Sequence, residues 1–397
     1  MNQSKTDKLR HLLKEEHLPA VIIDLDALDR NAEMLVNFGK PVRLATKSIR
    51  VTEVLKRVTS RHPEKFSGFM TYSIQETLAL ADAGFDDFLL AYPTLQTSDL
   101  SALQKIVDTG KKFSMVVDSL AQIDLLNKNW SSSNRLGLVI EVDGSLRLLG
   151  GMIHLGVRRS GVRTPKQVLS LIEKMDSTQK FKFAGLMVYE AQVAGLTDKN
   201  PFKSLLNPIA NMVRVWSQKG VIKLRAQIKS FIQSKGYTIS LFNGGGSGNL
   251  NWIAREESLT ELAAGSALYC PHLFDYYSNI HFEPACFFAL QVTRSSDPGF
   301  VTCQGGGYVA SGEPGWDRVA VPFDPPGLKL VNTEGTGEVQ TPLTVPANVS
   351  LDPGDVVLFR HAKAGEIMER FNEVLFVQDG KVVDRAKTYR GLGIQTY

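Results

Sequence analysis

Lys47 and a glycine-rich run are the features of this sequence whose residue types could do chemistry. Lys47 follows the apolar segment 42–46 and stands between two small residues, Thr46 and Ser48. This position suits an amine in a partly dry pocket, because burial disfavours the charged form, lowers the lysine pKa and favours attack on an aldehyde. The alternative is a surface lysine at a strand end, and position alone does not decide between the two.

The glycine-rich run covers residues 244–248 and follows the apolar segment 238–243. Residues without side chains let backbone amides converge on a phosphate, and a second small pair at 265–266 could close the same cup. The run lacks the GxxxxGK[ST] pattern of a nucleoside-triphosphate loop. A flexible surface loop is the competing interpretation. The residues that would form the cup are Gly245, Gly246, Ser247, Gly265 and Ser266.

Short apolar segments alternate with longer segments of helical period, which is typical of βα units around a parallel sheet. Nine strands are expected, at 20–25, 42–46, 67–71, 87–91, 113–118, 136–142, 182–189, 238–243 and 260–264. An eight-stranded barrel needs one fewer, so we expect the first strand to leave the barrel and join another sheet. Functional side chains of such barrels lie at the C-terminal ends of strands, where Lys47 and the glycine-rich run fall.

The βα rhythm stops near residue 275, and the sequence beyond it is rich in glycine and proline with short strand signals. The expected fold class is α/β: a (β/α)8 TIM barrel over residues 1–275, followed by a mainly-β domain over 276–397 that pairs with the N-terminal strand. In that domain Asp379-Gly380 predicts a hairpin turn.

Two helix starts are predicted from residues that can satisfy free backbone donors. Asp26 is the expected N-cap of the helix after the first strand. Ser73 begins a capping box, in which Glu76 would be the reciprocal partner.

Composition excludes several classes of protein. The 397 residues include 45 Lys and Arg against 41 Asp and Glu without a basic block, so nucleic acid is not an expected partner. No apolar stretch approaches the roughly 20 residues that cross a bilayer, and the polar N-terminus argues against a secretory signal. Cys270, Cys286 and Cys303 lack CxxC spacing, which argues against a disulfide framework and a zinc ribbon. We therefore expect a cytoplasmic protein with no membrane partner.

Six segments in order carry a resemblance to a known family. They are 19–31 (PAVIIDLDALDRN), 43–47 (RLATK), 159–162 (RSGV), 185–190 (GLMVYE), 244–248 (GGGSG) and 260–275. Together they resemble the alanine-racemase-like, fold type III pyridoxal-phosphate enzymes, and within these the D-threonine aldolase and D-serine dehydratase group. The similarity covers nearly the whole chain.

The resemblance implies pyridoxal 5'-phosphate as the cofactor, joined to Lys47 as a Schiff base with its phosphate in the glycine cup. It also implies that Arg159 and Tyr189 contact the cofactor ring or the substrate, and that Tyr269 binds the phosphate. Alternatives stay open for these three residues: a structural ion pair for Arg159, and core packing for both tyrosines.

The sequence departs from the group at its C-terminal metal motif. Aldolases and dehydratases of this group bind a divalent metal through a His-x-Asp or His-x-Cys pair, whereas the corresponding residues here are His361 and Lys363. Lysine has no spare lone pair at neutral pH, so we expect no metal ligand at this position. Either the Lys363 ammonium takes the place of the metal and acts on the substrate hydroxyl or a carboxylate, or both residues are exposed on a divergent strand.

The glycine-rich loop 304–313 carries Tyr308, a candidate acid or base. In related folds the β domain of one subunit closes the active site of its partner, so the resemblance implies a homodimer. The alternative is that these glycines serve only the geometry of the β domain.

The resemblance thus implies a pyridoxal-phosphate-dependent lyase that acts on a small-molecule substrate, a D-amino acid with a β-hydroxyl group. The reaction would be aldol cleavage or dehydration with deamination. An amino acid racemase is the second interpretation, and a non-catalytic carrier of the cofactor is the third. A nicotinamide-dependent oxidoreductase is disfavoured because GxGxxG does not follow the first strand.

Overall fold

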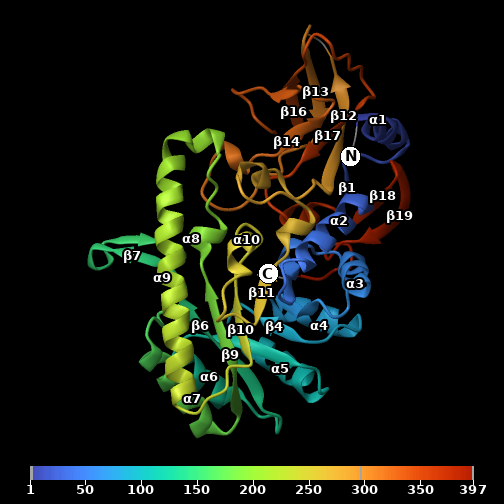
Figure 1. Cartoon of the computed structure of the whole chain (residues 1–397). Helices are drawn as coiled ribbons and strands as arrows, with labels where there is room; N and C mark the ends of the chain where they lie inside the picture. The colour runs from blue at the N-terminus through green and yellow to red at the C-terminus, as the bar shows by residue number, and fades with distance from the viewer. Residues whose placement is uncertain (1–2, 296, 396–397) are drawn as a thin grey trace.

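Eight parallel strands form a closed barrel in the computed structural model, which describes residues 3–295 and 297–395 (Figure 1). Neighbours around the barrel are β10, β11, β2, β3, β4, β5, β6 and β9. Their bounds are β2 Val42–Ala45, β3 Phe66–Thr71, β4 Phe88–Leu90, β5 Phe113–Val117, β6 Leu136–Asp143, β9 Phe181–Tyr189, β10 Leu241–Gly244 and β11 Glu261–Ala264. The predicted eight-stranded barrel is confirmed.

Helices surround the barrel and bury apolar stripes against it, except that the first helix packs against the C-terminal part of the chain. Their bounds are α1 Gln3–Leu12, α2 Leu25–Val36, α3 Thr52–Arg61, α4 Ile74–Asp82, α5 Thr97–Asp108, α6 Leu120–Asn129, α7 Pro165–Thr178, α8 Ala191–Ala194, α9 Asn207–Ser234 and α10 Leu250–Ile253. Figure 1 shows α9 running along one side of the barrel towards the β domain. Within the described ranges, no helix combines the length and apolar character that crossing a bilayer would require.

The helix starts differ in detail from the sequence-based expectation. The carboxylate of Asp24 accepts hydrogen bonds from the backbone N–H groups of Asp26 and Ala27, so the N-cap of α2 is Asp24 and the prediction of Asp26 was wrong. Ser73 caps α4 as predicted. Glu76, however, accepts a hydrogen bond from Tyr72 N instead of Ser73 N, so only half of the capping box forms.

The first strand, β1 Ala20–Asp24, lies outside the barrel in a nine-stranded sheet. The sheet runs in the order β15, β16, β13, β12, β1, β18 and β19, with β17 and β14 branching from β12. The bounds are β12 Cys286–Arg294, β13 Phe300–Gln304, β14 Val321–Asp324, β15 Lys329–Leu330, β16 Gln340–Thr344, β17 Val356–Arg360, β18 Glu373–Gln378 and β19 Lys381–Lys387. β1 pairs antiparallel with β12 and parallel with β18, which accounts for the surplus strand.

Asp379 and Gly380 join β18 to β19 with positive φ values of 50° and 72°, so the predicted hairpin is confirmed. The division into domains at 1–275 and 276–397 stays a prediction. Residues 1, 2, 296, 396 and 397 of those ranges lie outside the described residues.

The β domain contacts the barrel at the backbone of Lys47. Gly365 has a φ of +86°, and a Cβ added there would lie 1.9 Å from the carbonyl oxygen of Lys47. Arg50 Nε donates to the same carbonyl at 3.0 Å, and Arg50 Nη1 donates to Glu369 at 2.6 Å. The peptide that follows Lys47 is therefore fixed by groups from both parts of the chain.

Substitution of Gly365 by alanine tests this contact. Gly354→Ala is the matched control, because Gly354 has a φ of +98° and open space around its Cβ position. We expect the control to lose about 1–2 kcal/mol of unfolding free energy through its backbone conformation alone. Gly365→Ala should lose about 1–3 kcal/mol more, because its methyl group must displace the Lys47 backbone. Urea unfolding of both variants measures the difference, and equal losses would contradict the contact.

Candidate active site

A cavity of about 660 Å³ opens at the C-terminal ends of the barrel strands. Residues that end or follow six strands line it, namely β2, β3, β4, β9, β10 and β11. Its volume is typical of small-molecule sites, and its position is the one that TIM-barrel enzymes use for catalysis. Lys47 and the glycine cup both line this cavity, so the structure brings together the two features from which the sequence interpretation began.

Lys47 reaches into the cavity and donates a hydrogen bond from Nζ to the hydroxyl oxygen of Tyr92 at 2.6 Å. Its side chain is exposed within this open cavity, so the structure places Lys47 in a pocket and leaves the amine accessible. Sequence analysis missed Tyr92, which follows β4 at the same end of the barrel. An aromatic hydroxyl just after a barrel strand was the available signal.

Arg159 and Tyr189 face the same cavity. The Arg159 guanidinium lies over the rings of Tyr92 and Tyr189, 5.7 and 5.5 Å from their centroids, and forms no ion pair with any residue that the structure describes. This geometry is a cation–π contact. The structure therefore contradicts the alternative that Arg159 forms a structural ion pair. Burial, followed by the charge of Glu190, raises the pKa of Tyr189 to about 12, so its phenol keeps its proton.

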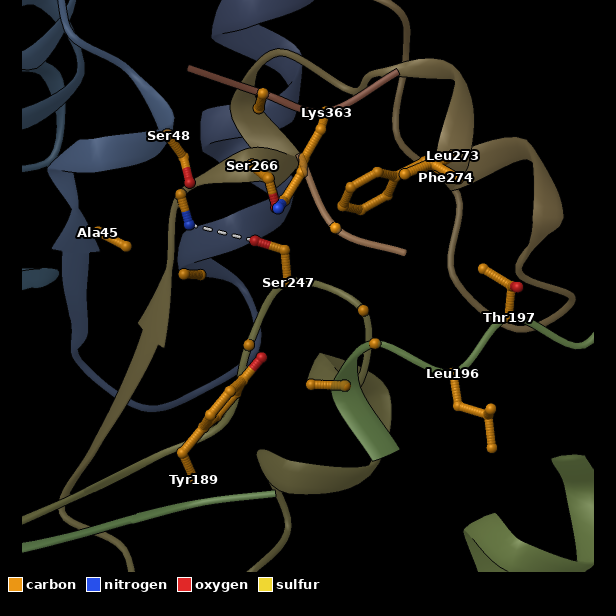
Figure 2. Close-up of a pocket in the computed structure, with 18 of the residues that line it drawn as sticks. Ala45, Ser48, Tyr189, Leu196, Thr197, Ser247, Ser266, Leu273, Phe274 and Lys363 are labelled. Carbon is orange, nitrogen blue, oxygen red and sulfur yellow. Dashed lines mark hydrogen bonds between the residues drawn. The ribbon is translucent and has the colours of Figure 1, made fainter. Parts of the chain in front are cut away.

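The glycine cup is held together by Ser247. Its hydroxyl accepts hydrogen bonds from the backbone N–H groups of Gly265 at 3.1 Å and Ala267 at 3.2 Å. Figure 2 shows the first of these bonds as a dashed line. The turn after β10 is thereby joined to the turn after β11, so the cup that the sequence suggested exists as one unit.

The cup presents backbone donors to the cavity. The N–H groups of Ser247, Gly248 and Ser266 have no hydrogen-bond partner among the described residues, and all three residues line the cavity. A Cβ at Gly246 would lie 3.1 Å from Ala194 Cβ, so a side chain there would crowd the cup. Unpaired amides beside small residues are the arrangement that binds a phosphate.

A buried ionic network supports the cup from behind. Asn249 accepts a hydrogen bond from Gly246 N at 3.0 Å and donates one to Glu190 at 2.6 Å. Glu190 forms an ion pair with Arg225, whose guanidinium also contacts Glu256 at 3.3 Å. Arg225 and Glu190 are both 0% exposed. These residues are separated widely in sequence, and although Glu190 ends the segment 185–190 noted above, no motif indicated the network.

Tyr269 does not bind in the cup. It is 0% exposed, is not among the residues lining the cavity, and donates its hydroxyl proton to Ile49 O at 2.9 Å. The packing alternative therefore describes Tyr269, and its assignment as a phosphate ligand was wrong because its donor is already used.

His361 and Tyr308 line a second, smaller cavity of about 410 Å³. His361 is 2% exposed, and burial, followed by the charge of Arg360, lowers its pKa to about 3. The Tyr308 ring packs between Phe288 and Phe371, with centroids 5.0 and 5.5 Å away. Within this chain the structure does not bring either residue to the cavity of Lys47, and His361 is not exposed.

Lys363 lines both cavities, so it is the member of the C-terminal motif that faces Lys47. Across the described residues, no three His, Cys, Asp or Glu side chains are grouped so that they could hold a metal ion. An ammonium cannot be a metal ligand, and the neighbouring His361 faces the other cavity. His361 and Lys363 therefore do not fit the divalent metal that the D-threonine aldolase and D-serine dehydratase group binds.

Comparison with known proteins gives a family match and two curated relatives. The sequence profile of the family "Alanine racemase, N-terminal domain" matches residues 23–271. A 3-hydroxy-D-aspartate aldolase from Paracoccus denitrificans is 21% identical over 257 residues, 64% of this chain and 60% of the relative. A second protein of that name and species is 24% identical over 185 residues, 45% of this chain and 44% of the relative. The matches thus span three fifths and under half of the relatives' lengths.

Solved structures of the same fold cover nearly the whole chain. D-Threonine aldolase from Filomicrobium marinum has a TM-score of 0.81 at 20% identity and covers 96% of both chains. D-threo-3-Hydroxyaspartate dehydratase from a Delftia species has a TM-score of 0.71 at 16% identity, covering 94% of this chain and 98% of the other. Alanine racemase from Bacillus anthracis has a TM-score of 0.65 at 13% identity, with coverage of 94% and 98%. At these identities the likeness shows the fold.

The buried carboxyl group of Glu76 makes the folding stability of the barrel depend on pH. This carboxyl group is 0% exposed on α4, and burial raises its pKa from 4.5 to about 7, although Tyr72 N and the charge of Arg50 act in the opposite direction. The folded chain therefore holds a proton that the unfolded chain releases. Stability is fully present below pH 4.5 and falls by about 3 kcal/mol as the pH rises through 7.

Glu76→Gln should remove this part of the pH dependence, because an amide does not titrate. Chemical unfolding at several pH values between 4 and 8 measures it, with the exposed Glu53→Gln as the control. A variant whose stability follows the same pH curve as the wild type would contradict the assignment.

Proposed function

Because the chain belongs to the alanine racemase N-terminal domain family, whose profile matches residues 23–271 of 397, we propose that it is a pyridoxal-phosphate-dependent lyase. The proposed substrate is a D-amino acid with a β-hydroxyl group. The observation that carries the proposal is that an amine, Lys47, and a phosphate-sized cup of free amides line one cavity. The names of the relatives, aldolases and a dehydratase of D-configured hydroxy amino acids, support the substrate class.

The residues around the cavity fit this cofactor. Lys47 Nζ would hold it covalently through its aldehyde carbon, and the amides of Ser247, Gly248 and Ser266 would bind its phosphate. Tyr189 would lie beside its ring. When bound, the cofactor supplies a conjugated ring that takes up the electron pair left when a bond at the substrate α-carbon breaks.

The protein supplies binding, orientation and proton transfer. Lys47 would move the substrate α-proton, and its hydrogen bond to Tyr92 at 2.6 Å orients it. The positive charge of Arg159, held over two aromatic rings, would attract an anionic group of the ligand. Whether the Cα–Cβ bond or the Cβ–O bond of the substrate breaks then depends on the protein group that contacts the β-hydroxyl.

A racemase is the second candidate, supported by the likeness in fold to alanine racemase. Racemisation needs a second base on the opposite face of the α-carbon. The sequence candidate for that base, Tyr308, lines the second cavity in this chain. We therefore favour the lyase. The proposal includes a cytoplasmic homodimer. Within one chain, Ser311 and Gly312 of the loop 304–313 line the cavity of Lys47.

Lys47→Ala tests the proposed covalent link. We expect the wild-type protein to show a visible absorbance band after incubation with pyridoxal phosphate, and the variant to lose that band. Its turnover of a D-β-hydroxy amino acid should fall at least about a hundredfold, because the variant lacks the group that transfers the proton. Lys56→Ala, at an exposed position on α3, is the matched control.

The same preparation should be offered D- and L-forms of serine, threonine, alanine and 3-hydroxyaspartate, with keto acid, aldehyde and enantiomer all measured. Keto acid or aldehyde from a D-hydroxy substrate supports the lyase. Interconversion of enantiomers alone would establish the racemase instead, and neither band nor product would end the proposal.

A further inference from the structure

Lys363 enters the cavity of Lys47 from the β domain. It follows β17 and lines the same cavity as Lys47 and Ser266. Figure 2 shows its side chain pointing into the cavity in the direction of Ser266. The turn that carries it is fixed to the barrel, because Gly365 packs on the carbonyl of Lys47. Lys47 and Lys363 therefore line one cavity, and the packing of Gly365 on the Lys47 carbonyl joins the two segments that carry them.

A small polar cluster holds the Lys363 ammonium in place. Its Nζ lies 3.1 Å from Ser311 Oγ and 3.3 Å from Glu366. Ser311 donates to both oxygens of Glu366, from Oγ at 2.5 Å and from its backbone N–H at 2.7 Å. Burial would raise the pKa of Glu366, but the Ser311 bonds and the Lys363 charge outweigh it and lower that pKa, so the carboxylate stays ionised.

These contacts orient the Lys363 ammonium but leave part of its hydrogen-bonding capacity unused. Strong charge-assisted bonds measure about 2.7–2.9 Å, and every contact of Lys363 Nζ is longer, from 3.1 to 3.4 Å. An ammonium carries three N–H donors and no lone pair. Its side chain is 47% exposed and lines the cavity of Lys47, so a donor is available to a ligand.

We propose that Lys363 donates a proton to the departing β-hydroxyl of the substrate, where resembling enzymes use a metal. This inference rests on the lyase function proposed above. The α-proton leaves to Lys47, and the Cα–H electron pair forms the Cα–Cβ double bond. The Cβ–O bond breaks with its electron pair on oxygen, which takes a proton from Lys363 Nζ and leaves as water. Lys363 then regains a proton from solvent.

The same geometry selects between the two lyase reactions. Aldol cleavage requires a base that removes the proton of the β-hydroxyl. An ammonium has no lone pair and cannot do this, whereas elimination of water requires an acid. Lys363 therefore makes the enzyme a dehydratase, with a keto acid and ammonia as the products after hydrolysis of the released enamine.

A substrate pair separates proton donation from structural support. Both D-serine and β-chloro-D-alanine lose their β-substituent by elimination, but chloride leaves without a proton. In the holoenzyme, Lys363→Met should lower kcat on D-serine or D-threo-3-hydroxyaspartate by about a hundredfold or more and on β-chloro-D-alanine by only a fewfold. Lys381→Met, on the exposed face of β19, is the control and should match the wild type on both.

Lys363→Arg is the second variant, because it keeps the positive charge but is a much poorer proton donor. It should show the same selective loss, and its cofactor absorbance should be unchanged. Equal losses on both substrates, or weaker retention of pyridoxal phosphate, would assign Lys363 to structure or to phosphate binding and overturn the inference.

Metal analysis of the purified wild-type holoenzyme completes the test. One divalent ion per chain, with activity lost to a chelator and restored by the ion, would overturn the inference and leave the lyase function intact. A wild type that eliminates chloride but not hydroxide would also overturn it. If the wild type eliminates neither group, the proposed function falls together with the inference.

Discussion

The buried guanidinium of Arg43 is the interaction on which the geometry of the site depends. Arg43 lies on β2 and bonds to Glu261 on β11 at 2.7 and 3.1 Å, and Asn243 on β10 donates to the same carboxylate at 2.8 Å. These three neighbouring strands lead into Lys47, the glycine cup and Ser266. Arg43 is 3% exposed and Glu261 is 5% exposed, so loss of the guanidinium would leave the Glu261 carboxylate uncompensated in the interior, at a cost of several kcal/mol.

Both the barrel and the second sheet contribute residues that shape the site. The carbonyl of Lys47 receives Arg50 Nε and packs on Gly365, and the turn containing Gly365 carries Lys363. Two segments distant in sequence therefore meet at one backbone contact. A change in the β domain can alter chemistry at Lys47 without touching any residue of the barrel.

The sequence predicted those parts of the molecule that local patterns encode. All nine strands expected up to residue 264 are present, because apolar periodicity and turn residues are local features. Lys47 and the glycine cup were identified because each follows the end of an expected strand. Tyr92, the Glu190–Arg225 network and the second cavity were not found, because each arises from contacts between segments far apart in the chain. Tyr269 was misassigned since its hydroxyl partner, Ile49, lies on another element.

The position of β1 has a consequence for synthesis of the protein. Val21 pairs with Val374, which lies far along the chain, so the ribosome makes the two strands at widely separated times. Before β18 is synthesised, β1 can pair with β12 but not with β18. Its apolar residues are then covered on one edge only. The second sheet is thus completed only after β18 has been synthesised, and nascent chains that stall before it would expose an unpaired, aggregation-prone edge.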